Sequence, residues 1–206
     1  KHSNSSGSRK TPVFVIHRMP TVIFINGTSS SGKTSLLKLL QKKLPEPFLD
    51  MGIDKFIWML PSRYLDRPLW DDVLGKAVHS GPVGWSLFSG MHHAIAAAAS
   101  RGNNILADHV FVEKAWVDEC AELFAEMNAY LIGLQCPLEV LEQREKDRKD
   151  RTLGQAKLQY EVIHKYTQYD LELDTSKLTI EECAEQVIER LKNPPLAFRK
   201  LQAGHA

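Results

Sequence analysis

The amino-acid sequence predicts an α/β fold in three layers, in which a mainly parallel sheet is covered by helices on both faces. The first observation is the run 21–26, which is continuous and rich in β-branched and aromatic residues, as in a strand buried on both faces. The second is that similar apolar runs recur along the chain with segments of helix length between them. Strands separated by helices favour parallel pairing, because a parallel connection has to return to the starting end of the sheet.

The first predicted unit is a strand, a glycine-rich turn and a helix. The strand at 21–26 runs directly into the turn 27–32, and the predicted helix occupies 33–44. Leucines recur at helical spacing in this last segment until Pro45 ends the pattern.

The same alternation continues downstream. Helices are predicted at 91–100, at 114–127 and from Cys136-Pro137 onward, and strands at 105–107, 130–134 and 170–174. Thr179 and Glu182 have the spacing of a capping box, which predicts the start of a last helix.

Length and composition indicate one packed domain. The chain has 206 residues, of which 43% are hydrophobic and 25% charged, close to an average globular protein. The formal net charge is +1, so no general attraction to nucleic acid or to an anionic membrane follows. The three cysteines stand far apart without a CxxC pair, which is typical of reduced thiols. A structural metal is not expected, because the adjacent His92 and His93 would diverge on a helix.

The domain is predicted to span residues 19–192. Residues 1–18 are interpreted as a flexible leader or a segment added during cloning, since the start is polar and rich in serine. Residues 193–206, with two prolines and no periodicity, are interpreted as a tail. The apolar run 13–16 is too short for a signal peptide or a membrane span, so we expect a cytoplasmic protein.

Residues 27–34 carry the strongest signal for function. They read Gly-Thr-Ser-Ser-Ser-Gly-Lys-Thr and match the P-loop pattern G-x-x-x-x-G-K-[ST] at every fixed position. Such a loop turns several backbone N–H groups toward one anion, and the following helix adds the positive end of its dipole. Lys33 would reach the β- and γ-phosphates of ATP, and the Thr34 hydroxyl would bind Mg²⁺. The alternative is an ordinary glycine-serine turn entering a helix. The candidate ATP-binding residues here are Gly27, Ser29, Ser30, Ser31, Gly32, Lys33, Thr34 and Ser35.

The sequence around Asp108 bears on the kind of P-loop protein. A switch GTPase would carry an N-K-x-D motif, which the sequence lacks. Motor-type ATPases follow the Walker B aspartate with a glutamate, whereas Asp108 precedes His109. Asp108 is therefore a candidate for organising Mg²⁺ in a kinase. The alternative is a strand-end residue that caps a turn.

Residues 142–151 form a run in which nine of ten side chains are charged. Such runs are usually solvated helix faces held by i, i+4 pairs. Small P-loop kinases place a lid here, and cations that close over the transferring group stabilise its charge. We therefore predict a lid at about 142–156, in which Arg148 and Arg151 are catalytic, with the solvated face as the alternative.

Asp54 is the candidate general base. It precedes a short apolar helix, so one interpretation is an N-cap, a role worth about 1 kcal/mol. The other is a carboxylate just beyond the second strand, at the edge where open parallel sheets bind ligands. There it would accept a proton from a substrate hydroxyl. Position and spacing leave both interpretations open.

With these motifs, the chain resembles the chloramphenicol phosphotransferase family. The pattern N-G-x-S-S-x-G-K-[ST] appears at 26–34, L-P-E-P-[WF]-L at 44–49 and G-[VI]-D at 52–54. Further blocks keep the family's order at 81–82, 108–111, 148–154, 162–164 and 169–175. The similarity spans roughly residues 20–192. Its first block is shared by many P-loop kinases, and the next two are more particular to this family.

The resemblance implies a P-loop kinase fold with a five-stranded parallel sheet of the nucleotide-kinase type, and ATP and Mg²⁺ at the P-loop. It implies that Asp54 is the base and that Arg148 and Arg151 act from the lid. It also implies that Asp174 and Thr175 lie near the adenine. In the namesake enzyme the acceptor is a hydroxyl of chloramphenicol.

Two departures from the family pattern concern the site. The family has paired aspartates after the third strand where this chain has Asp108 and His109, so one acidic contribution to metal or substrate binding is expected to be lost. The region expected to line the acceptor pocket carries large aromatic residues, which are as compatible with core packing. They are Trp58, Tyr64, Trp70 and Trp85.

Together these observations predict an ATP-dependent kinase that transfers the γ-phosphate to an alcohol of a small molecule, with antibiotic inactivation as one expected role. One alternative is a zeta-toxin-like kinase, a class that resembles this family and phosphorylates nucleotide sugars. The other is a module that senses ATP without transferring phosphate. A nucleic-acid acceptor is disfavoured, because the sequence shows no stacking platform interleaved with basic residues. The oligomeric state is left open.

Overall fold

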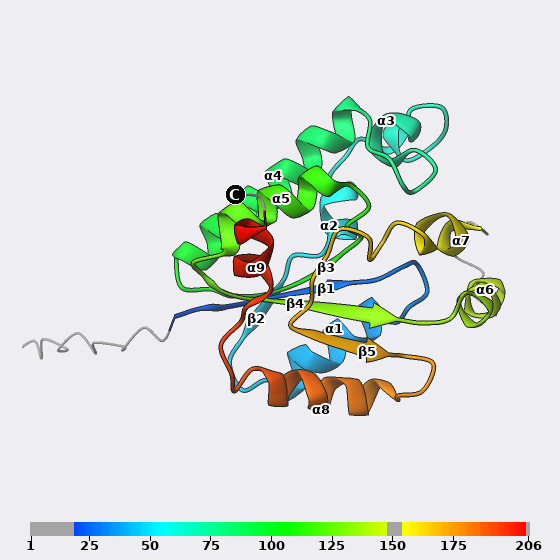
Figure 1. Ribbon diagram of the computed structural model, residues 1–206. Helices are drawn as coiled ribbons and strands as arrows, with labels where there is room; N and C mark the ends of the chain where they lie inside the picture. The colour runs from blue at the N-terminus through cyan, green and yellow to red at the C-terminus, as the bar shows by residue number, and fades with distance from the viewer. Residues whose placement is uncertain (1–18, 148–153, 205–206) are drawn as a thin grey trace, which may run out of the picture.

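A five-stranded, all-parallel sheet forms the centre of the computed structural model, which describes residues 19–147 and 154–204 (Figure 1). The strands are β1 (Thr21–Asn26), β2 (Phe48–Asp50), β3 (Asn104–His109), β4 (Asn128–Gln135) and β5 (Leu171–Asp174). Their order across the sheet is β2-β3-β1-β4-β5. The α/β class and the five-stranded parallel sheet predicted from the sequence are confirmed.

Helices cover both faces of the sheet (Figure 1). One face packs against α2 (Ile53–Ile57), α3 (Asp71–Leu74), α4 (Pro82–Ser100), α5 (Lys114–Phe124) and α9 (Ala197–Ala203). The other packs against α1 (Lys33–Lys43) and α8 (Ile180–Arg190). A 3-10 turn occupies Ser62–Tyr64, and α6 (Leu138–Asp147) and α7 (Gln155–Tyr160) lie near the carboxyl end of the sheet.

The central strand β1 shows why a continuous apolar run was needed. Its side chains alternate between the two faces of the sheet, and each face has its own core. Val22 and Phe24 belong to the core beneath α4 and α5, whereas Ile23 and Ile25 belong to the core shared with α1 and α8. All four side chains are fully buried. A polar residue at any of them would face one core or the other.

The helix starts and ends differ from the sequence prediction in detail. Helix α4 begins at Pro82 instead of residue 91, with the proline in its first turn, where its missing N–H is not needed. Helix α5 ends at Phe124, ahead of residue 127. The predicted capping box of α8 is confirmed, because the Glu182 backbone N–H donates to Thr179 Oγ1 and the Thr179 backbone N–H donates to the Glu182 carboxylate.

The interpretation of residues 193–206 as a tail is wrong for the described part of this segment. Residues 197–203 form helix α9, which buries Phe198 and Leu201 against the core. The Phe198 ring lies 5.5 Å from that of Phe24, measured between centroids. The buried Asp170 carboxylate holds the start of the helix by accepting the Leu196 backbone N–H at 2.7 Å. The two prolines of this segment favoured the interpretation as a tail, whereas the helix is stabilised by Phe24 and Asp170, which are distant in sequence.

The carboxyl ends of β1, β2 and β3 meet at one edge of the sheet. The parallel register pairs Ile25 with Asp108 and Asp50 with Leu106. The P-loop that follows β1, helix α2 that follows β2, and Asp108 near the end of β3 therefore converge. Open parallel sheets bind their ligands at this edge.

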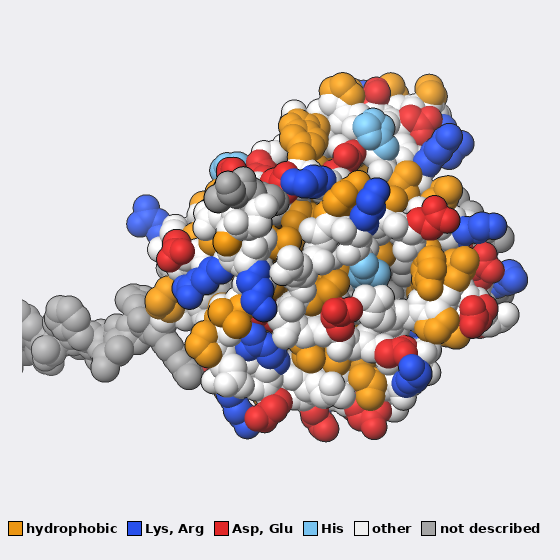
Figure 2. Space-filling view, in the orientation of Figure 1, with side chains coloured by type: hydrophobic (Ala, Val, Ile, Leu, Met, Phe, Trp, Pro, Cys, Tyr) orange, Lys and Arg blue, Asp and Glu red, His pale blue; other side chains and the backbone are white. Residues whose placement is uncertain are grey.

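The molecular surface shows no division by charge on the face drawn in Figure 2. Lysine and arginine side chains are interspersed there with acidic and apolar ones. Among the helices within residues 19–147 and 154–204, none combines the length and apolar character that crossing a membrane requires.

Candidate active site

The P-loop has a backbone shape that its sequence explains. Gly32, at the start of α1, has φ +98°, a left-handed conformation that side chains with a Cβ rarely adopt. Ser30 is also left-handed, with φ 63°. The loop thus curls around the first turn of an eleven-residue helix, where the backbone N–H groups lack acceptors within the helix and the positive end of the helix dipole favours an anion.

The side chains of the P-loop fit a phosphate group. The hydroxyls of Ser29, Ser30 and Ser31 are buried and have no hydrogen-bond partner among the described residues. Buried polar groups normally have partners, so these hydroxyls are suited to receive one from a ligand. The Lys33 ammonium lies across the loop, where it donates to the carbonyl oxygens of Gly27 and Thr28 at 2.7 Å each. A cation, hydroxyls and a helix N-terminus are thereby gathered at one place.

Asp108 and Thr34 form the pair predicted to hold Mg²⁺. Thr34 Oγ1 donates to Asp108 Oδ2 at 3.2 Å, so two oxygen ligands lie side by side. Burial raises the pKa of the Asp108 carboxyl, and the carboxylates of Asp54 and Asp50 raise it further, while Lys33 opposes the shift. A buried carboxylate among other acids gains from a nearby dication, and Mg²⁺ prefers such oxygen ligands. The residues present fit the metal, and the hydrogen bond of Asp108 goes to Thr34 rather than to a turn.

Gly52 makes room for the Asp108 carboxylate. A Cβ built on Gly52 would lie 1.9 Å from Asp108 Oδ1 and 3.0 Å from its Cγ. The backbone of Gly52 is extended, with φ −69° and ψ 160°, so the glycine is required by the neighbouring side chain and not by its dihedral angles. The sequence showed this glycine only as part of the Gly-Ile-Asp block, without its physical role.

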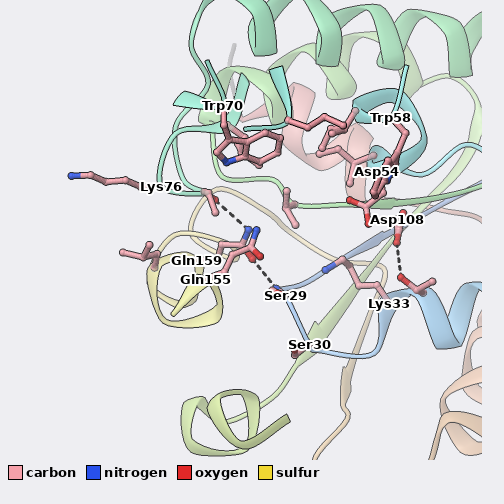
Figure 3. Close-up of a pocket in the computed structure, with 18 of the residues that line it drawn as sticks. Ser29, Ser30, Lys33, Asp54, Trp58, Trp70, Lys76, Asp108, Gln155 and Gln159 are labelled. Atoms are coloured by element: carbon pink, nitrogen blue, oxygen red, sulfur yellow. Dashed lines mark hydrogen bonds between the residues drawn. The ribbon is translucent and has the colours of Figure 1, made fainter. Parts of the chain in front are cut away.

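Asp54 lies inside α2 and does not cap it. The N-cap is Gly52, and no side chain among the described residues caps this helix, so the N-cap interpretation of Asp54 is wrong. Its side chain lines the same cavity as Lys33 and Asp108 (Figure 3). The structure therefore brings together the predicted base, the P-loop lysine and the predicted metal ligand.

One cavity of about 790 Å³ holds these groups. In addition to the P-loop and Asp54, Trp58 and Trp70 line this cavity (Figure 3). Of the other aromatic candidates, Trp85 is a partly exposed residue of α4 and Tyr64 packs against the core, and neither lines the cavity. The volume is in the range of small-molecule sites, and the two indole rings give it an apolar wall.

The segment predicted to lie near the adenine is tied to the P-loop through Arg144. Its guanidinium donates to the carbonyl oxygen of Thr175 at 2.6 Å and to Thr175 Oγ1 at 3.2 Å. It also reaches the carbonyl oxygen of Ser30 at 3.5 Å. Asp174 instead accepts from the Ser176 hydroxyl and pairs with Lys177, which together lower the pKa of Asp174 to about 2. Thr175 is close to the P-loop, whereas the Asp174 carboxylate is engaged locally.

The predicted lid is only partly within the described structure. Arg148 and Arg151 lie outside the described residues, so their role stays a prediction. Glu145 of α6 is buried, and its carboxylate accepts the backbone N–H groups of Gly154 and Ala156 at 2.7 and 2.8 Å. This carboxylate fixes the start of α7 against α6.

His109 is not part of the cavity. It follows Asp108 in β3, so its side chain points to the opposite face of the sheet, into the core beneath α4 and α5. There it stacks on Phe111 at 3.9 Å between centroids, and its Nε2 lies 2.9 Å from Nε2 of His92. The expectation that this position removes an acidic group from the site is therefore wrong, because a side chain at 109 faces away from the cavity.

The strand order, the P-loop ahead of α1 and the acidic residue near the end of β3 define a P-loop kinase. Solved kinases share the fold. The APS kinase CysC of Mycobacterium tuberculosis, in complex with AMPPNP and APS, is 17% identical with a TM-score of 0.59, over 85% of this chain and 99% of that one. A sugar kinase from Janibacter sp. is 16% identical with a TM-score of 0.62, over 84% of this chain and 95% of that one.

Within that class, the chain belongs to the chloramphenicol phosphotransferase-like family. The family model described as "Chloramphenicol phosphotransferase-like protein" matches residues 20–192. Proteins named "Putative O-phosphotransferase" in two strains of Mycobacterium tuberculosis are 31% identical over 196 residues, covering 88% of this chain and 87% of theirs. The family predicted from the sequence is confirmed.

Proposed function

We propose that this protein transfers the γ-phosphoryl group of ATP to a hydroxyl group of a small molecule. The observation that carries the proposal is the single cavity in which Lys33, Thr34, Asp54 and Asp108 meet. It supports the proposal because the P-loop, the candidate metal ligands and a carboxylate line one space. Family membership and the names of the mycobacterial relatives support transfer to oxygen.

We propose a separate role in the transfer for each of these residues. The P-loop N–H groups and Lys33 bind the β- and γ-phosphates, and Thr34 with Asp108 would hold Mg²⁺. When bound there, the metal would supply positive charge that offsets the charge of the phosphates. Asp54 accepts a hydrogen bond from the acceptor hydroxyl and takes its proton as the new P–O bond forms and ADP leaves. Because the transition state is loose, positioning of the hydroxyl by Asp54 contributes as much as proton removal.

The acceptor is proposed to be an alcohol with an apolar body, of which chloramphenicol is the family's example. Trp58, Trp70 and Leu65 line the same cavity as the P-loop, and the two indole rings favour flat apolar groups. Inactivation of an antibiotic by phosphorylation is the role that follows. Arg148 and Arg151 are proposed to neutralise developing charge over the transferring group.

The test is a screen of ADP formation against chloramphenicol, aminoglycosides, nucleosides and nucleotide sugars, with mass spectrometry of the products. Lys33→Ala and Asp54→Asn are assayed beside two matched controls: Lys38→Ala at an exposed position of the same helix, and Asp118→Asn in α5. We expect a phosphorylated alcohol from the wild type and both controls only.

Two outcomes would favour the alternatives. Transfer to nucleotide sugars alone, with toxicity on expression that requires Lys33 and Asp54, would favour a zeta-toxin-like kinase. ATP binding without transfer to any alcohol, unaffected by Asp54→Asn, would favour a nucleotide-binding module and overturn the proposal.

A further inference from the structure

One buried amide connects the two walls of the cavity. Gln159 of α7 is 1% exposed, and its side chain spans from the P-loop to the segment after α3. Its Oε1 accepts the Ser29 backbone N–H at 2.7 Å, and its Nε2 donates to the carbonyl oxygen of Ala77 at 3.2 Å. Figure 3 shows both hydrogen bonds at the edge of the cavity. A single side chain therefore contacts the nucleotide-binding loop and the opposite wall.

The wall held by this amide has a conformation that needs support. Lys76 and Ala77 are consecutive residues with φ 49° and 59°, in the left-handed region that residues other than glycine rarely adopt. Such backbone persists only where surrounding contacts determine it. Besides Gln159, the contacts that hold it include the hydrogen bond from the Ala77 N–H to the Leu74 carbonyl, that from the Val78 N–H to the Gly75 carbonyl, and the bridge between Gly75 and His79. Both left-handed residues line the cavity.

The position of Gln159 is itself fixed to the end of β1. Its carbonyl oxygen accepts the backbone N–H of Ile163 at 2.9 Å. The Ile163 carbonyl accepts from the Asn26 side chain at 2.8 Å, and the Asn26 oxygen accepts the Phe111 N–H at 2.9 Å. Asn26 is buried and immediately precedes the P-loop. These hydrogen bonds fix the position of Gln159 relative to the sheet, independently of the two loops that its side chain contacts.

We propose that Gln159 is a positioning residue that sets the distance between the P-loop and the wall at 74–77, and so controls acceptor affinity. This wall is joined to Trp70, one of the proposed acceptor-binding residues, by the hydrogen bond from the Leu74 N–H to the Trp70 carbonyl. The proposal rests on the proposed phosphotransfer, in which the acceptor oxygen has to lie close to the γ-phosphorus and in line with the leaving group. Oε1 accepts a hydrogen bond from the P-loop and Nε2 donates one to the wall, so the two hydrogen bonds can be tested with different variants.

The Gln159→Glu variant removes the donor, keeps the acceptor and adds a negative charge beside the P-loop. A carboxylate still accepts the Ser29 N–H, but it presents an oxygen to the Ala77 carbonyl in place of an N–H group. We expect the KM of the acceptor to rise by about 10-fold or more through loss of the donor, whereas the added charge repels the phosphates and raises the KM of ATP by a smaller factor, which high salt reduces. The Gln159→Met variant has similar length and removes both hydrogen bonds, so both KM values rise. Gln202→Met, at an exposed position of α9, is the control.

The readout separates positioning from a merely structural role. Loss of stability alone would lower the melting temperature and the active fraction in both variants, without a selective change in acceptor KM. Equal acceptor KM values for the wild type and Gln159→Glu, or a rise in the two KM values by the same factor in that variant, would overturn the proposal.

The same variants distinguish this proposal from the proposed function. If no acceptor is phosphorylated by the wild type, the proposed function fails. The effect of the Gln159 contact with the P-loop on nucleotide affinity is then measured by calorimetry with AMPPNP. The inference predicts weaker nucleotide binding for the neutral Gln159→Met than for the wild type by several-fold. Identical binding of AMPPNP by Gln159→Met and the wild type would contradict it.

Discussion

The Gly52→Ala substitution tests whether the Asp108 carboxylate has to occupy its observed position. The new Cβ would lie 1.9 Å from Asp108 Oδ1, whereas ordinary contact begins at 3.4 Å. The carboxylate therefore has to withdraw by about 1.5 Å, the difference between these two distances. Its hydrogen bond with Thr34, now 3.2 Å, would not survive a shift of that size.

The expected cost is catalytic and local. Misplacement of a catalytic group by about 1 Å can reduce a rate by about 10²-fold, so we expect kcat/KM to fall by about 10- to 100-fold and the Mg²⁺ requirement to rise. The backbone at Gly52 is extended and accepts alanine, so the loss of stability should stay within about 1 kcal/mol. Steady-state kinetics over a range of Mg²⁺ concentrations, with urea unfolding as a check on stability, measures both effects.

Two comparisons isolate the cause. Gly90→Ala is the matched control, because a Cβ on Gly90 of α4 meets nothing within 4 Å and should leave the kinetics unchanged. In an Asp108→Ala background the clash with the carboxylate is gone, so Gly52→Ala should cost nothing further. Wild-type kinetics for Gly52→Ala, or an equal loss in both backgrounds, would refute the reasoning.

Three further outcomes are expected. Lys33→Ala should lower kcat by about 10²- to 10³-fold with an unchanged melting temperature, since a cation at the transferring phosphate is removed, and turnover equal to that of Lys38→Ala would remove this lysine from the mechanism. Asp54→Asn should lower kcat by about 10²-fold or more, and an unchanged rate would reduce the aspartate to a structural residue. Burial and the neighbouring His92 lower the pKa of His109 well below its ordinary value, so the ring stays neutral in the fold while the unfolded chain binds a proton below about pH 6.5. The stability that this site contributes is present above that pH and is lost as the pH falls, by about 1.4 kcal/mol per unit. Urea unfolding at about pH 7.5 and about pH 5.5 should show a smaller loss for His109→Gln than for the wild type, and equal losses would contradict the assignment.

Local sequence patterns predicted those features that depend on neighbours along the chain. The apolar run of β1, the glycines and lysine of the P-loop, and the capping box at Thr179 each carry their cause within a few residues. Helix α9 does not, because Phe198 is buried against Phe24 and Phe124, which are distant in sequence. The contacts that stabilise this helix are long-range, so the local sequence did not predict it.

The site was predicted in part for the same reason. Gly52 and Asp108 are in contact only because β2 and β3 pair in the sheet, and Ser29 and Gln159 meet across 130 positions of sequence. No pattern within the chain could show either contact. The orientation of His109 was accessible, since adjacent residues of a strand point to opposite faces and cannot both enter one cavity.

The central claim is that the cavity moves a phosphoryl group from ATP to an alcohol. The most direct measurement is the fate of an isotope-labelled γ-phosphate, followed by mass spectrometry, when the protein is incubated with ATP, Mg²⁺ and the acceptor panel. We predict that the label appears in a phosphomonoester of one acceptor, with one ester formed per ADP, and that Asp54→Asn suppresses it. Label found only in ATP and inorganic phosphate with every acceptor would contradict the account.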